Sequence, residues 1–309
     1  MGRTSVKDVI APTDPTPAGL TRRRALSIAA AWAAGTLARP GWPLPAPGWP
    51  LWVVEDRGGR VYLTGETPAR ATPWHDARIQ GLVGQCGALW TETNQTRHDD
   101  VQALIRRDGM DTATPLLAKL GAADRERVAA AAALAKTPLD ALATMRPWLA
   151  AFALEQAYYG EQNFPESGTA EKVLLPDAQR AGLALSSEFA TQGDVIAFLG
   201  AMSPREDLQY LQYTLDHILD GTPANERVYE GWAHGDFSGA AAMVERMRTQ
   251  QPELYKKHVI GRNQAWVPRI EAMLGDAKPA LVVVGLYHAA GPDSVQAQLR
   301  ARGLTVRAL

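Results

Sequence analysis

The chain of 309 residues has a single cysteine, Cys86, which excludes an intramolecular disulfide. It also lacks an excess of either charge, because 32 lysines and arginines oppose 33 aspartates and glutamates for a formal net charge of -1. Nucleic acids and anionic lipids are bound chiefly through clustered lysine and arginine, so neither is expected as a partner. The hydrophobic content of 46% is ordinary for a globular protein, and a chain of this length can bury a core without disulfides.

The Ala-rich apolar run over residues 25–38 is too short to span a bilayer comfortably, which takes about 20 apolar residues. It follows the basic segment Thr-Arg-Arg-Arg at residues 21–24 and ends in small residues. This arrangement is typical of an export signal, and the paired arginines indicate the twin-arginine type. We therefore predict that residues 1–38 direct export to the periplasm or the medium, through the twin-arginine or the general secretory route. No stable membrane span is expected after cleavage.

Residues 39–50 are rich in proline and tryptophan. Proline fixes its own backbone angle and lacks an amide hydrogen, so a segment with this many prolines can continue neither a helix nor a central strand. We expect a linker here, with Trp42 and Trp49 exposed, and a folded domain over residues 51–309.

The folded domain opens with a β pattern and continues with long helical ones. Residues 51–55 and 60–64 are rich in β-branched and aromatic side chains and flank a Gly-Gly turn, which is typical of a hairpin. A further strand is expected over residues 87–92. Helices are expected over residues 74–82, 101–154, 203–219, 237–248 and 251–274.

The end of the chain gives the clearest pattern. Residues 280–284 (Ala-Leu-Val-Val-Val) form a continuous β-branched run of the kind that is buried on both faces of a sheet. A helix beginning at residues 292–294 and a strand over residues 304–309 follow. The loop after such a strand lies at the carboxyl end of the sheet, where open α/β sheets build their sites. We predict an α/β fold: a central, mostly parallel β-sheet with an N-terminal hairpin and a large helical insertion.

Four motifs, taken in order, resemble those of the TraB/GumN family. They are Gly-Glu-Thr-Pro at residues 65–68, Trp-Ala-His-Gly-Asp at residues 232–236, Gly-Arg-Asn-Gln-Ala-Trp at residues 261–266 and Gly-Leu-Tyr-His at residues 285–288. The resemblance covers residues 51–309. It implies a fold shared with Tiki-type metalloproteases and with a haem-binding lipoprotein group. It also implies a site of two Gly-x-x-His motifs, an acidic residue after the second core strand, and an arginine.

In this sequence the resemblance assigns His288 to the second Gly-x-x-His motif, Glu92 to the acidic position and Arg262 to the arginine. Glu188 also matches a position that is commonly acidic. Imidazole and carboxylate groups can hold a divalent ion such as Mn, Co or Zn and acidify a bound water. The resemblance therefore implies a metal-dependent hydrolase in which His288 and Glu92 are metal ligands and act in catalysis together with Arg262.

The first Gly-x-x-His motif lacks its histidine, because Pro68 stands in that position and has no ligand atom. Glu66 is two residues earlier, on the same side of an extended chain, and could replace the missing metal ligand. His75 is the other candidate. Two ligands without a third give a weak, labile site, so we expect a divalent metal to bind weakly or not at all.

Two kinds of function therefore stay open. The first is a degenerate divalent-metal hydrolase acting on a peptide or protein substrate that the sequence does not identify. The second is a non-catalytic binding or regulatory protein on the same scaffold, with a metal or haem among its conceivable ligands. The remaining histidines show no mutual ligand spacing and are interpreted as surface or turn residues: His75, His98, His217, His234 and His258.

The export signal is tested by replacing Arg22 and Arg23 with lysine and following a periplasmic reporter fused to the chain. We expect export to fall sharply, because the twin-arginine route requires the arginine pair and lysine preserves only its charge. Undiminished export would contradict the twin-arginine assignment. Retention of the unmodified chain in the cytoplasm would contradict export altogether.

Overall fold

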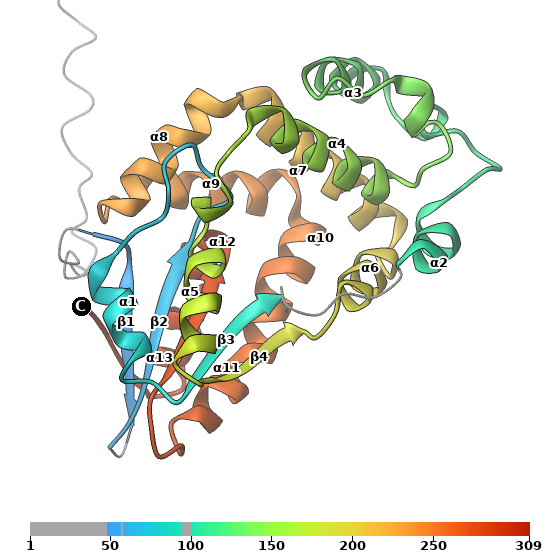
Figure 1. The fold of residues 1–309 in the computed structure, drawn as a ribbon. Helices are drawn as coiled ribbons and strands as arrows, with labels where there is room; N and C mark the ends of the chain where they lie inside the picture. Colours follow the sequence, from blue (N-terminus) through green and yellow to red (C-terminus); the bar gives the residue numbers. More distant parts are fainter. Residues whose placement is uncertain (1–47, 57, 94–100) are drawn as a thin grey trace, which may run out of the picture. The chain divides into compact units, whose positions relative to one another are not determined.

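The computed structural model of the protein describes residues 48–56, 58–93 and 101–309 (Figure 1). The export signal expected over residues 1–38 lies outside this part of the chain, as do His98 and all but the last three residues of the expected linker. The fold given below is that of the described residues.

Within the described part of the chain, the core is a six-stranded sheet with the order β4-β3-β5-β2-β1-β6. The strands are β1 (Leu51–Asp56), β2 (Gly59–Glu66), β3 (Ala88–Thr93), β4 (Ala184–Phe189), β5 (Ala280–Gly285) and β6 (Thr305–Ala308). Pairing is parallel from β4 through β3 and β5 to β2, whereas β1 is antiparallel to β2 and to β6. The predicted mostly parallel sheet with an N-terminal hairpin is confirmed.

The expected central strand is β5, and it is buried on both faces: residues 280–284 have no exposed surface. The last strand, β6, lies in the same sheet as predicted, but the hairpin separates it from β5. The helix α13 (Val295–Ala301) therefore connects two strands of the sheet that are not neighbours. The N-terminal hairpin occupies the space between them because β2 pairs with β5 directly.

Helices cover both faces of the sheet. On one face α5 (Ala170–Arg180) packs against α1 (Ala77–Val83), and on the other α11 (Arg262–Met273) packs against α13 (Figure 1). The short α12 (Leu286–Ala289) follows β5 directly. The predicted insertion between β3 and β5 contains most other helices: α2 (Gln102–Leu104), α3 (Ala122–Leu134), α4 (Pro147–Gln162), α6 (Gln192–Gly200), α7 (Pro204–Asp220), α8 (Thr222–Ala233), α9 (Ser238–Gln250) and α10 (Pro252–Tyr255). Across the described ranges, no helix combines the length and apolar character needed to cross a bilayer.

The first described residues are already part of the packed structure. Trp49 is only 6% exposed, its ring centroid lies 5.8 Å from that of Trp74, and its backbone N–H donates to Asp76 Oδ2 at 3.1 Å. The expectation that Trp49 is exposed is wrong, because this end of the expected linker packs against the segment before α1. Trp42 lies outside the described residues.

Val283→Asp tests the placement of the core. Val283 is fully buried in β5, and an aspartate there would bury an unpaired charge, which we expect to lower the free energy of unfolding by about 4 kcal/mol. Urea denaturation followed by circular dichroism measures the change. The matched control is Thr305→Asp at an exposed position of the edge strand β6, expected to cost less than about 1 kcal/mol. If the two variants unfold at the same urea concentration, the core has been misplaced.

Candidate functional site

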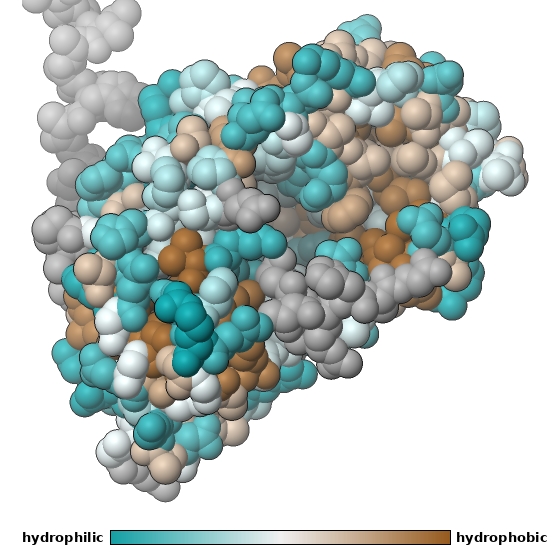
Figure 2. Space-filling view, in the orientation of Figure 1, coloured by the Kyte–Doolittle hydropathy of each residue, from teal (hydrophilic) through white to brown (hydrophobic). Residues whose placement is uncertain are grey.

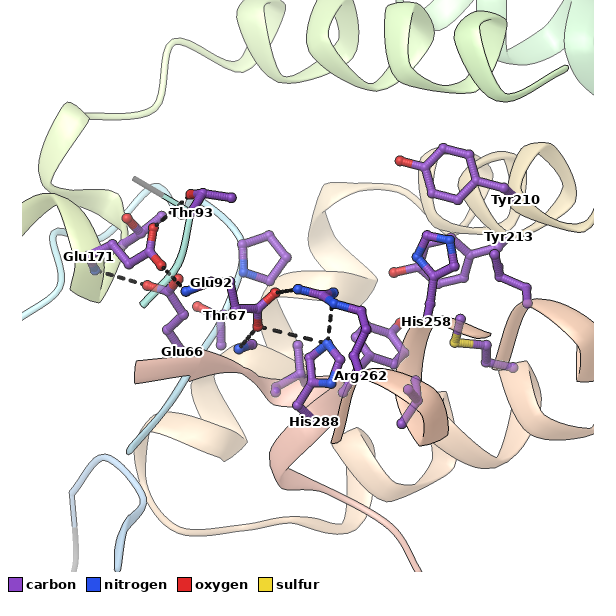
Figure 3. Close-up of a pocket in the computed structure, with 18 of the residues that line it drawn as sticks. Glu66, Thr67, Glu92, Thr93, Glu171, Tyr210, Tyr213, His258, Arg262 and His288 are labelled. Atoms are coloured by element: carbon purple, nitrogen blue, oxygen red, sulfur yellow. Dashed lines mark hydrogen bonds and ion pairs between the residues drawn. The ribbon is translucent and has the colours of Figure 1, made fainter. Parts of the chain in front are cut away.

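Three parallel strands bring their carboxyl ends together at one end of the sheet, because β5 pairs with β2 on one side and with β3 on the other. Glu66 ends β2, Glu92 is one residue before the end of β3, and His288 follows β5 in α12. Their side chains line a pocket with a volume of about 410 Å³ (Figure 3). The prediction that the ends of β3 and β5 converge is confirmed.

Arg262 joins two carboxylates at this end of the sheet. It is the first residue of α11 and directly follows a π-helical turn, η5 (Lys256–Gly261), a feature that is frequent at functional sites. Its Nη2 donates to Glu92 Oε2 at 2.7 Å and to Glu188 Oε2 at 2.5 Å, and its Nε donates to Glu188 at 2.9 Å. The Arg262 side chain is 12% exposed. One nearly buried cation is therefore hydrogen-bonded to two nearly buried carboxylates, which is the pairing that buried charges require.

His288 has both ring nitrogens engaged. Nδ1 lies 2.7 Å from Asn263 Oδ1, an oxygen that can only accept, so Nδ1 carries the proton. The side-chain nitrogen of Asn263 donates to the Asp293 carbonyl at 2.8 Å, which fixes the orientation of the amide. Nε2 then accepts from Arg262 Nη1 at 3.1 Å. Burial and the charge of Arg262 lower the pKa of His288 to about 3, although the charge of Glu92 acts to raise it. The ring is therefore neutral.

Glu92 is ionised despite its burial. Burial alone would raise its pKa, but the charge of Arg262 and the backbone N–H of Gly285 lower that pKa to about 2. The Gly285 N–H donates to Glu92 Oε1 at 2.5 Å, so the two carboxylate oxygens are held by different groups. Glycine suits this position because a Cβ at Gly285 would lie 3.2 Å from Oε1.

Glu66 does not replace the missing histidine. Its Oε2 accepts a hydrogen bond at 3.0 Å from the Glu171 backbone N–H in the first turn of α5, so the carboxyl group lies at the N-terminus of that helix (Figure 3). Burial and the neighbouring carboxylates of Glu171 and Glu92 raise the pKa of Glu66. The other candidate, His75, is exposed and is not among the residues that line the pocket.

These groups do not fit a divalent metal. Glu92 Oε2 and His288 Nε2 are both hydrogen-bonded to the guanidinium of Arg262, and Glu92 Oε1 accepts from the backbone N–H of Gly285. That cation repels a second cation and occupies the ligand atoms that a metal would need. Among the residues that the structure describes, no three His, Cys, Asp or Glu side chains are placed to hold a metal ion. The expected ligand set of His288, Glu92 and Glu66 is therefore not assembled.

The pocket has a polar end and an aromatic end. At the strand ends it is lined by Glu66, Thr67 and Pro68, the residue that replaces the first histidine. At the other end it is lined by aromatic side chains from α7, η5 and α12: Tyr210, Tyr213, His258 and Tyr287. Figure 3 shows Glu66 and Thr67 on one side of Arg262 and Tyr210, Tyr213 and His258 on the other. Figure 2 shows the surface hollowed between the sheet and the helices of the insertion.

Two histidines interpreted as surface or turn residues are not at the surface. His258 is half-buried, its ring stacks on that of Tyr210 with centroids 5.6 Å apart, and burial lowers its pKa to about 3. His217 is 4% exposed and bonds the hydroxyl of Tyr159 at 2.7 Å. That interpretation is wrong for both. For His217 the sequence did contain a signal of burial, because Tyr210, Tyr213 and His217 recur at the i, i+3, i+7 spacing of one helix face. His234 is exposed at the end of α8.

Two further residues of the site were not predicted at all. Glu171 lines the pocket and holds Glu66 through its backbone, and Asn263 sets the tautomer of His288. Asn263 directly follows Arg262, so its position in the same motif was the only sequence signal. Nothing in the sequence around Glu171 distinguishes it from other acidic residues at helix starts.

The TraB/PrgY/gumN family model matches residues 50–308. The chain belongs to the TraB/PrgY/gumN family. The match includes every strand of the sheet and the helical insertion, and it confirms the resemblance inferred from the four motifs. No curated protein and no solved structure gives a significant match. Membership of the TraB/PrgY/gumN family therefore fixes the relationship of the chain but not its activity.

Arg262→Met tests the central contact of the site. The variant leaves Glu92 and Glu188 nearly buried without their cation, and we expect it to lower the free energy of unfolding by about 3–5 kcal/mol. Adding Glu92→Gln and Glu188→Gln to the same chain removes the two unpaired charges and should restore most of the loss. Urea denaturation at neutral pH measures both. A single variant as stable as the unmodified protein would show that Arg262 does not hold these carboxylates.

Proposed function

We propose that this TraB/PrgY/gumN family protein is exported and binds a ligand in the pocket at the strand ends without hydrolysing it. The observation that carries the proposal is the position of the Arg262 guanidinium. It is hydrogen-bonded to Glu92 Oε2 and His288 Nε2, the atoms on which a metal-dependent hydrolase would rely. Export rests on the sequence pattern of residues 1–38 alone.

Three features argue against hydrolysis. Pro68 supplies no ligand atom, and Glu66 is engaged at the N-terminus of α5. In addition, His288 has no nitrogen available to accept a proton from water, because Nδ1 is protonated and Nε2 already accepts from Arg262. A general base must be within hydrogen-bond reach of the proton that it removes. The same contact leaves His288 no free nitrogen for haem iron.

The cavity itself supports binding. Its volume of about 410 Å³ is in the range of small-molecule sites, and such sites combine apolar and aromatic walls with a few polar groups. Losing a metal ligand abolishes hydrolysis without abolishing the fold, because activity depends on the site and not on the scaffold. A binding or regulatory protein on the TraB/PrgY/gumN scaffold is therefore the function that this geometry supports best.

Metal analysis tests the proposal directly. The purified protein is incubated with Mn, Co or Zn and desalted, and its metal content is measured by inductively coupled plasma mass spectrometry. The same sample is assayed for peptidase activity with and without a chelator. We expect far less than one metal ion per chain and no chelator-sensitive activity, because Arg262 occupies both ligand atoms. The double variant Pro68→His with Arg262→Ala restores a ligand and removes the competing cation, so it should take up more metal than either single variant.

Stoichiometric metal in the unmodified protein, lost on His288→Ala, would overturn the proposal. Peptidase activity that disappears with that metal would restore the hydrolase function implied by the family resemblance.

A further inference from the structure

The side chains that form the aromatic end of the pocket are neutral rings. The rings of Tyr210 and His258 stack with an angle of 20° between them, and those of Tyr213 and Tyr287 meet edge to face with centroids 5.6 Å apart. His258 is neutral because burial lowers its pKa to about 3. Burial also raises the pKa of Tyr210, so that phenol stays protonated. Aromatic walls of this kind favour another ring, which gains both buried apolar area and edge or face contacts.

The polar end contains a hydroxyl group that has no partner. Thr67 is 2% exposed and lines the pocket, and its Oγ1 makes no hydrogen bond. A buried polar atom without a partner costs free energy that a ligand group placed beside it would recover. Glu66 lines the same pocket, so a ligand group at this end also has within the cavity the carboxyl group that lies at the N-terminus of α5.

The charges at this end disfavour an anionic ligand group. The carboxyl groups that line it, Glu66, Glu92 and Glu171, outnumber the lining cations Arg262 and Lys172. The N–H groups of Arg262 are already directed to Glu92, Glu188 and His288. An anion would therefore meet carboxyl groups and find the guanidinium engaged. A group that donates hydrogen bonds has acceptors here in the carboxyl oxygens of Glu66 and the hydroxyl of Thr67.

We propose that the pocket binds an aromatic ring that carries a hydrogen-bond-donating head, either an amide or an ammonium group. The ring lies beside Tyr213 and His258, and the head lies at Thr67 and Glu66. This ligand class rests on the proposed binding function. A small aromatic amine or amide and an aromatic residue of a peptide share this chemistry.

Calorimetric titration of the purified chain with three matched probes tests the proposal. 4-Phenylbutyramide, 4-phenylbutylamine and 4-phenylbutyrate have the same ring and chain and differ only in the head. We expect the amide and the amine to bind at least tenfold more tightly than the carboxylate. Equal affinities for the three, or no binding of any, would overturn the proposal. A dipeptide amide with N-terminal phenylalanine distinguishes the two sources, because a peptide ligand predicts tighter binding of this probe than of the amine.

Variants of two unpartnered threonines separate a binding role from a structural one. Thr67→Val removes the hydroxyl at nearly constant shape and should weaken binding of the amide about tenfold, whereas Thr67→Ser keeps the hydroxyl and should bind normally. Thr214 is the matched control: its hydroxyl is also buried without a partner, but it does not line the pocket, so Thr214→Val should bind normally. Equal loss in both valine variants would contradict a specific contact at Thr67.

The metal content of the same sample distinguishes a failure of the proposed ligand class from a failure of the proposed binding function. Without bound metal, failure of the probes overturns the ligand class and leaves a binding protein of another specificity. Stoichiometric metal lost on His288→Ala overturns the proposed function whatever the probes do.

Discussion

Arg262 lies at the ends of β3, β4 and β5, and its guanidinium contacts Glu92 of β3, Glu188 of β4 and His288 of α12, which follows β5. Charges of this kind are costly to bury singly, and the arrangement is stable because each has a partner: two carboxylates share one cation, and a neutral imidazole accepts from it. The low pKa of Glu92 follows from these contacts and outweighs the effect of burial, whereas the low pKa of His288 follows from burial and the charge of Arg262. Removing the guanidinium would change every group at this end of the sheet at once.

The rest of the site follows from this arrangement. Because Arg262 holds Glu92 and His288, these two side chains form one wall of the cavity and offer no open coordination position. The sheet supplies the polar end at the strand termini, and the helical insertion supplies the aromatic end through α7 and η5. At the strand ends Arg262 and its two carboxylates form an internal ion pair in place of the metal site that the family resemblance implied.

The sequence predicted five of the six strands because their signals are local, and it missed β4, which carries Glu188. A run such as residues 280–284 can be buried only in a central strand, and the hairpin follows from two β-rich segments around a Gly-Gly turn. The convergence of Glu92 and His288 followed from the rule that parallel strands end on the same side. The motifs also meet in space: the Trp232 ring nitrogen donates to the Gly65 carbonyl at 2.9 Å, and a Cβ at Gly65 would clash with that ring.

The sequence could not predict what depends on contacts between distant segments. Glu66 was a candidate to replace the missing metal ligand, but its carboxyl group accepts a hydrogen bond at the N-terminus of α5, which begins more than a hundred residues later. Arg262 was assigned to the site. Whether the site binds or excludes a metal depends on how close the guanidinium lies to Glu92 and His288, and a sequence motif does not specify that distance. His217 and His258 were misplaced because their burial arises from packing between helices.

The state of the His288 ring tests the account most directly. Nitrogen NMR of the isotopically labelled protein reports which ring nitrogen carries the proton and whether a metal coordinates the other. We predict a neutral ring protonated at Nδ1, with an Nε2 resonance that does not move when zinc is added, because Arg262 already donates to that atom. A shift of Nε2 on stoichiometric addition of zinc would show that the metal displaces Arg262, and it would contradict the account.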